Sequence, residues 1–331
     1  MFAVGLDVDK IVFTEKILLC AGNFCINSPL VLNTLGKIYL KQYNLPEQSA
    51  GNLSFSTKAT AITKNTSNSY INLPLISEHV PNHKSKFTNT ELGYFLAGLI
   101  EGNGWFSEKE LHLIFTENDI TLAYFIKKQI GYGNVYKIAT NKSVKYICTN
   151  QKGLIKILKL INGKLVSNLK YDQLIKFNYQ KQFNYSILPP LNSINLDNYW
   201  LAGFTQANGC FNIRVLKSKT QNTGFSVRLE FYLKQDDLFL LNLFFNTVKM
   251  GNIYYYDNGI WCYKSSGFKT AAMLINYYDF FNLFAGKYVS YLKFRKVYLM
   301  ITKGKHLEEK GINKIKSIAT KGSSETSTQE V

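Results

Sequence analysis

The sequence predicts an α+β protein made of two pseudo-symmetric repeats, each running helix, strand, strand, helix, strand, strand, helix (αββαββα). The main observation is a nine-residue run that occurs twice, at 96–104 (LAGLIEGNG) and 201–209 (LAGFTQANG). Two further blocks recur in the same order. GNVY at 133–136 matches GNIY at 251–254, and GKLVSNLKY at 163–171 matches GKYVSYLKF at 286–294. Three matched blocks in one order indicate an internal duplication, with a period longer than that of solenoid repeats.

The order of elements follows from local signals. Thr88 and Glu91 have capping-box spacing ahead of an apolar run, which predicts the start of the first helix. The runs LHLIF (111–115) and SVRLEF (226–231) alternate apolar and polar residues, which predicts half-buried strands. Pro189 and Pro190 mark a linker, so we expect a first repeat at 88–188 and a second at 189–322.

The composition favours a folded protein with a polyanionic partner. The chain has 331 residues, a hydrophobic content of 46% and a net charge of +17. Its five cysteines show no CxxC spacing, which argues against a disulfide framework and a zinc site. No window reaches the roughly 18 uninterrupted apolar residues of a spanning helix, so we expect no membrane association.

Small residues in the repeated run predict how the two motif helices pack. Ala97 and Gly98 in one copy, and Ala202 and Gly203 in the other, allow the two backbones to approach closely. The alternative is an ordinary buried helix with a glycine at its C-terminal end in each repeat. The duplication favours a pseudo-two-fold helix interface.

The repeated run resembles the signature of the LAGLIDADG homing endonucleases and maturases, in their monomeric two-motif form. The resemblance implies a saddle of antiparallel sheets along the DNA major groove, with the two motif helices at its centre. It also implies carboxylates at the eighth motif position that hold Mg²⁺ for phosphodiester hydrolysis. This chain has Asn103 and Asn208 there, and Glu101 is a third candidate metal ligand, at the sixth position.

The resemblance suggests further catalytic candidates besides Asn103 and Asn208. Lys264 matches a strand position at which the family often has a lysine near the scissile phosphate, and we expect Asn150 to be its counterpart in the first repeat. Gln235, at the end of a strand, matches a site often used to order the attacking water.

The basic residues of the strands are the candidate nucleic-acid contacts. In a protein this basic, a single lysine is more often a solvated charge, but the clustering favours a binding surface. The set comprises Arg214, Lys217, Lys219, Arg228 and Lys234 in the second repeat, and Lys137, Lys142 and Lys145 in the first.

Residues 1–87 are predicted to be an extension outside the repeats. Residues 1–9 (MFAVGLDVD) resemble a segment of mitochondrial cytochrome c oxidase subunit 1, as in an intron reading frame that continues from an upstream exon. A Ser/Thr/Asn-rich stretch at 48–71 predicts a linker, and 323–331 a disordered tail. We expect synthesis in the mitochondrial matrix, where no transit peptide is needed.

Three functions are compatible with these features. The first is a site-specific double-strand DNA endonuclease for intron homing, with cleavage impaired by Asn103 and Asn208. The second is an RNA maturase that binds its host intron RNA and needs no catalytic carboxylates. The third is a decaying frame with neither activity, against which the regular hydrophobic pattern argues.

Overall fold

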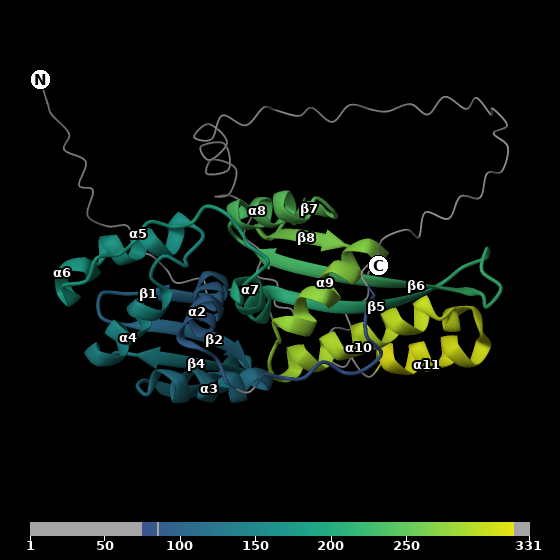
Figure 1. Cartoon of the computed structure of the whole chain (residues 1–331), viewed down its shortest axis with the longest axis horizontal. Coiled ribbons are helices and arrows are strands. Elements are labelled where there is room, and N and C mark those ends of the chain that lie inside the picture. Colours follow the sequence, from purple (N-terminus) through teal and green to yellow (C-terminus); the bar gives the residue numbers. More distant parts are fainter. Residues whose placement is uncertain (1–74, 85, 321–331) are drawn as a thin grey trace, which may run out of the picture. The chain divides into compact units, whose positions relative to one another are not determined.

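A computed structural model describes residues 75–84 and 86–320 (Figure 1). Most of the predicted extension 1–87 and all of the tail 323–331 lie outside these residues. The elements of the first repeat are α2 (Asn89–Asn103), β1 (Gly104–Phe106), β2 (Leu111–Thr116), η1 (Glu117–Asp119), α3 (Ile120–Ile130), β3 (Asn134–Ile138), η2 (Ala139–Asn141), β4 (Ser143–Cys148), α4 (Gln151–Ile161), α5 (Asn168–Lys176) and α6 (Tyr179–Phe183).

The second repeat has the same order, and its first two strands are longer than their counterparts in the first repeat. Its elements are α7 (Trp200–Asn208), β5 (Gly209–Lys217), β6 (Phe225–Gln235), α8 (Leu238–Val248), β7 (Asn252–Tyr255), β8 (Trp261–Ser265), α9 (Phe268–Phe280), α10 (Ala285–Thr302), η3 (Lys305–Leu307) and α11 (Glu309–Thr320). The two four-stranded antiparallel sheets have matching orders, β1-β2-β4-β3 and β5-β6-β8-β7. The predicted α+β class and the αββαββα order are therefore confirmed, with α5, α6, α10 and α11 completing or extending the repeats.

Local sequence accounts for the helix and strand ends. Thr88 and Glu91 form the expected capping box at the start of α2. Gly133 and Gly251 adopt positive φ angles of 93° and 88°, a conformation that favours glycine. Each lies against the ring of a buried tyrosine, Tyr146 or Tyr263, and that hydroxyl donates a hydrogen bond to the carbonyl of the residue before the glycine.

The third matched block is not structurally equivalent in the two repeats, so this prediction was wrong. Gly163 has a φ of 69° and precedes α5, whereas Gly286 lies inside α10. The equivalent positions are the N-caps of these helices, Ser167 and Phe284. The first copy spans a turn and the start of α5, whereas the second lies within α10.

The segment that leads into the first repeat packs on the second. The Arg295 guanidinium of α10 donates to the carbonyl of Ser77 at 2.7 Å, and the His83 imidazole lies 2.9 Å from the carbonyl of Leu283. Residues 75–84 are therefore part of the folded unit rather than a free linker. Within the described residues, no helix is both long and apolar enough to cross a membrane.

Candidate nucleic-acid interface and metal positions

Helices α2 and α7 lie side by side (Figure 1), and their backbones come closest at the two motif glycines, Gly98 and Gly203. A Cβ atom on Gly98 would overlap the carbonyl oxygen of Trp200, and one on Gly203 would overlap that of Phe95. The alanine before each glycine is also buried in the shared core. Glycine is required here because backbone lies directly against backbone, and the crossing brings the C-terminal ends of both helices together.

At these ends, Asn103 and Asn208 bind the opposite helix reciprocally. The Asn103 Nδ2 donates to the carbonyl of Ala207 at 3.3 Å, and the Asn208 Nδ2 donates to the carbonyl of Gly102 at 3.3 Å. Each acceptor is the residue before the other asparagine. The pair is therefore a symmetric amide clamp between the repeats, and an aspartate in the same position could not donate these bonds.

Gln235 joins this junction from the end of β6. Its Oε1 lies 3.4 Å from the Asn208 Nδ2, and its Nε2 donates to the carbonyl of Glu101 at 3.0 Å. The ladder pairs Gly104 with Leu113 and Gly209 with Leu233, so the counterpart of Gln235 is Phe115. The junction therefore has a polar side chain of this kind on one side only.

Glu101 is buried between the repeats. Its carboxylate accepts hydrogen bonds from the backbone N–H groups of Val166 and Ser167 and, at 2.6 Å, from the Trp200 indole of the other repeat. Burial raises the pKa of Glu101 to about 7, although these donors favour its charged form. Both carboxylate oxygens are engaged, so the arrangement does not support a metal-ligand role for Glu101.

The counterpart of Glu101 uses a neutral side chain for a related task. Gln206 accepts from the backbone N–H of Phe284 at 2.9 Å and donates to the Asp119 carboxylate at 3.3 Å. Both sixth-position residues thus connect the motif helix to the start of a later helix in their own repeat. Their function in this structure is to fix the junction.

The residues at the junction do not fit a divalent metal ion. Such ions prefer several anionic oxygen ligands, whereas the eighth-position side chains here are neutral and point N–H donors at the nearby carbonyls. Across residues 75–84 and 86–320, no three or more His, Cys, Asp or Glu side chains form a group that could hold a metal ion.

Lys264 lies on β8 in the second sheet, paired with Tyr232 of β6. Its Nζ is 5.3 Å from the centre of the Tyr232 ring. Because the first-repeat ladder pairs His112 with Ile147 at the same position, the counterpart of Lys264 is Ile147. The prediction of Asn150 was wrong, since that residue caps α4 by accepting from the N–H of Lys152 and of the next residue.

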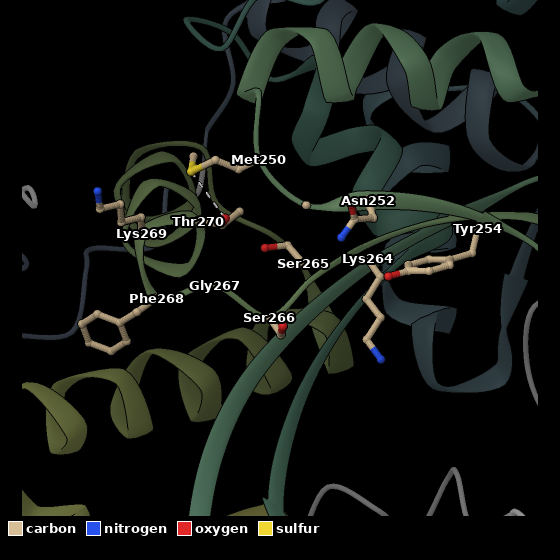
Figure 2. Close-up of a pocket in the computed structure, with 11 residues that line it drawn as sticks. Met250, Asn252, Tyr254, Lys264, Ser265, Ser266, Gly267, Phe268, Lys269 and Thr270 are labelled. Carbon is tan, nitrogen blue, oxygen red and sulfur yellow. Dashed lines mark hydrogen bonds between the residues drawn. The ribbon is translucent and has the colours of Figure 1, made fainter. Parts of the chain in front are cut away.

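Lys264 also borders a cavity of about 460 Å³ between the β7–β8 pair and the start of α9. Figure 2 shows Asn252 and Lys264 extending from the strands on one side, with Lys269 and Thr270 in the first turn of α9 on the other. The cavity places a lysine beside polar groups at the edge of the second sheet.

Strand alternation divides the predicted basic residues between two faces. In the second sheet, Phe211 and Phe231 pack against each other, and Phe211 also contacts rings of α9 and α10. The residues that alternate with these point to the opposite side, which we call the open face. The basic residues on the open face of the second sheet are Arg214, Arg228, Lys234 and Lys264.

The other predicted lysines lie elsewhere. Lys217 pairs with Phe225 and alternates away from Arg214, and Lys137 pairs with the buried Val144. Lys142 lies in the turn before β4, and Lys219 in the connection between β5 and β6. Sequence clustering alone did not distinguish these positions from the open face.

The open face of the first sheet carries an aromatic stack. The rings of Trp105 and His112 stack at 4.8 Å with an interplanar angle of 9°, and the Lys145 Nζ lies 4.9 Å from the Trp105 ring centre. The sequence analysis predicted only Lys145 here. The signal for the other two was available, because Trp105 directly follows the motif and His112 is a polar residue in an apolar strand.

Comparison with known proteins identifies the family of the chain. The LAGLIDADG endonuclease family model matches residues 201–298. An uncharacterised cox1 intron-2 protein of Schizosaccharomyces pombe is 39% identical over 297 residues, which cover 88% of each chain. The chain belongs to the LAGLIDADG family.

More distant relatives of this LAGLIDADG protein have both endonuclease and maturase names. A probable intron-encoded endonuclease 4 of Neurospora crassa is 26% identical over 64% of this chain, and the intron-encoded RNA maturase bI4 of Saccharomyces cerevisiae is 25% identical over 73%. The matched regions span 41% and 43% of those two longer proteins.

Solved structures show the same fold. The LAGLIDADG meganuclease I-AabMI bound to uncleaved DNA matches with a TM-score of 0.57 and 24% identity, covering 69% of this chain and 98% of that one. The meganuclease I-SmaMI, at 19% identity and a TM-score of 0.54, covers 71% of this chain and was solved on its uncleaved DNA target with calcium ions.

Proposed function

We propose that this LAGLIDADG protein is an intron-encoded, site-specific DNA endonuclease that binds double-stranded DNA at an intron insertion site, with its cleavage step impaired. The observation that carries DNA binding is the alternation that gathers Arg214, Arg228, Lys234 and Lys264 on one open face and Lys145 on the other. We further propose that the chain acts as a monomer, since one chain contains both repeats, and that it works in the mitochondrial matrix, as a cox1 intron origin implies.

On the open faces, each type of side chain has a definite task. Exposed Lys234 and Arg228 reach phosphate oxygens, which position the protein without reading sequence. Arginine and amide side chains on the same strands read base edges in the major groove. Gln235, which binds Asn208, is the side chain that we propose orders a water molecule near the junction.

Impaired cleavage follows from the clamp. A divalent ion such as Mg²⁺ would supply activation of water and neutralisation of phosphate charge. Asn103 and Asn208 offer no anionic ligand and instead bind each other's helix directly. The junction is therefore stable without metal, and binding is retained where chemistry is weakened.

The same clamp favours a second candidate, an RNA maturase. A protein that assists splicing needs the paired repeats and the basic open faces, but no carboxylates at the junction. The matched relative bI4 of S. cerevisiae is named as an RNA maturase. Host intron RNA is then the ligand of the same faces.

The test compares the wild type with the Asn103→Asp/Asn208→Asp variant on a duplex spanning the intronless cox1 junction, in Mg²⁺, Mn²⁺ or EDTA. We expect the wild type to bind without measurable cutting and the variant to cut. We also expect Mg²⁺ to raise the melting temperature of the variant alone, because each aspartate leaves a carbonyl without its donor, at a cost of ~1–3 kcal/mol, and adds a negative charge that a bound cation would neutralise.

Each outcome assigns a function. Efficient cutting by the wild type would show that other ligands hold the metal and that the clamp does not impair cleavage. Binding to the intron RNA without binding to the duplex would make the protein a maturase. Failure to bind either nucleic acid would overturn both candidates.

A further inference from the structure

An acidic residue lies among the cations on the open face of the second sheet. Glu230 occupies the middle of β6, and its side chain is only 2% exposed. Its carboxylate accepts hydrogen bonds from Asn212 Nδ2 at 3.1 Å and from the Tyr232 hydroxyl at 2.5 Å. The same carboxylate lies 3.7 Å from Arg214 Nη1 and 3.6 Å from Lys264 Nζ.

A buried carboxylate is costly unless it is paired and hydrogen-bonded. Here the pairing cations lie above it, with Arg214 41% and Lys264 29% exposed. Burial and the bond to Glu230 raise the pKa of Tyr232, so its hydroxyl stays a donor to the carboxylate. The buried carboxylate is therefore held in one position by Asn212 and Tyr232, while the two cations beside it face solvent.

This acid also resolves a repulsion in the sheet. Arg214 and Arg228 are directly paired across β5 and β6, and like charges in such pairs are destabilising. Glu230 contacts Arg214 but has no ion pair with Arg228 among the described residues. The two arginines therefore differ in their surroundings: Arg214 lies beside the carboxylate of Glu230, and Arg228 does not.

We propose that Glu230 is a positioning residue, which fixes Arg214 and Lys264 over the second sheet and withholds part of their charge from phosphates, so that they serve base readout rather than general polyanion binding. The proposal rests on the nucleic-acid binding proposed above. On a surface that serves affinity alone, every cation strengthens binding to phosphates. A carboxylate among the cations weakens that attraction and fixes the direction in which their side chains point.

The first repeat supplies a matched control. Glu110 lies three residues before Leu113, as Glu230 does before Leu233, and these leucines hold the same ladder position. Glu110 is 39% exposed, and its one ion-pair partner within the described part of the chain is His112, at 2.7 Å. Neutralising Glu110 therefore releases no lysine or arginine.

The experiment measures the salt dependence of binding to a random-sequence duplex at pH 8 for the wild type, Glu230→Gln and Glu110→Gln. Each released cation that reaches a phosphate adds about 0.9 to the slope of log K against log salt. We expect the slope to steepen by about 1–2 for Glu230→Gln and to stay unchanged for Glu110→Gln. Selection from a random duplex pool is expected to yield a less specific consensus for Glu230→Gln.

An unchanged slope for folded Glu230→Gln, or equal steepening in both variants, would overturn the proposal. If Glu230→Gln does not fold, Arg214→Gln and Arg228→Gln in the wild-type background decide it. We expect Arg228→Gln to reduce the slope by about 0.9 and Arg214→Gln by much less; equal reductions would contradict the role of Glu230. If the wild type binds no duplex, the proposed function fails, and the same slopes measured on heparin still test Glu230.

Discussion

The two repeats match in the glycines and asparagines where they meet, and they differ in the side chains that face outward. At the junction, Gly98 matches Gly203 and Asn103 matches Asn208, with reciprocal contacts. On the open faces, the first repeat has a stack of Trp105, His112 and Lys145, whereas the second has ion pairs around Glu230.

This difference shows where duplication constrains a sequence. Gly98, Gly203, Asn103 and Asn208 each contact the helix of their own counterpart, so a change in one copy of these residues must be matched by the other. An open-face side chain has no such counterpart, and its neighbours lie on its own sheet. These four positions therefore keep their symmetry, and the faces are free to recognise two different halves of a target.

The largest expected effect comes from Gly98→Ala at the symmetric crossing. The added Cβ overlaps the Trp200 carbonyl oxygen, which is backbone and cannot rotate away, so the helices must separate. We expect the free energy of unfolding to fall by about 3 kcal/mol or more, which is the upper range for overpacked cores, or the variant to fail to fold. Denaturant unfolding measures it.

Gly286→Ala provides the control for that substitution. Gly286 lies in α10, where a Cβ would meet only the Asn118 Cβ at 4.0 Å. We expect little change or a gain of up to about 1 kcal/mol from helix propensity. If alanine has an equally small effect on stability at Gly98 and at Gly286, the two helices do not pack as closely as the structure shows.

A smaller effect separates Glu101 from its neutral counterpart Gln206. The folded-state pKa of Glu101, about 7, lies above the ordinary value of 4.5, so the folded protein binds the proton more tightly. This contribution to stability is complete below pH 4.5 and is lost as the pH rises to about 7. We expect ~2–3 kcal/mol across that window for the wild type.

Urea unfolding at several pH values, compared with Glu101→Gln, measures this contribution. The variant lacks the titrating group, so the unfolding free energy of the wild type minus that of the variant should fall from pH 5 to pH 7. The same pH dependence in both proteins would assign the titration to another residue. Since Gln206 does not titrate, the effect belongs to the first repeat alone.

The smallest expected effect concerns the open faces. Trp105→Ala removes the ring that stacks on His112 and supports Lys145, and we expect duplex affinity to fall about five- to tenfold, as for a cation–π contact of roughly 1 kcal/mol. Cys210 holds the matched ladder position in the second sheet, opposite Tyr232. Cys210→Ala should leave affinity unchanged in an electrophoretic mobility-shift assay, and an equal loss would remove the distinction between the faces.

Much of the fold was predictable because its signals are local. The capping box at Thr88, the strand-forming runs at 111–115 and 226–231, and each copy of the motif act within a few residues. The prediction of a half-buried strand was wrong at 111–115, where all five residues are buried. The motif glycines likewise indicated close helix packing, since only close backbone contact needs that pattern. The equivalence of the third block was not predictable, because the same residue pattern forms a turn and a helix start in one repeat and lies within a helix in the other.

The site was predictable only in part. The sequence by itself determined that both eighth motif positions are asparagine, and therefore that these two positions carry no charge. Only the tertiary structure decided what these amides do, because their acceptors, Ala207 and Gly102, belong to the opposite helix. The same holds for Glu230, whose partners come from three strands and meet only once the sheet has formed. Sequence fixes the chemistry of each side chain, but hydrogen bonds and ion pairs depend on distances that folding alone sets.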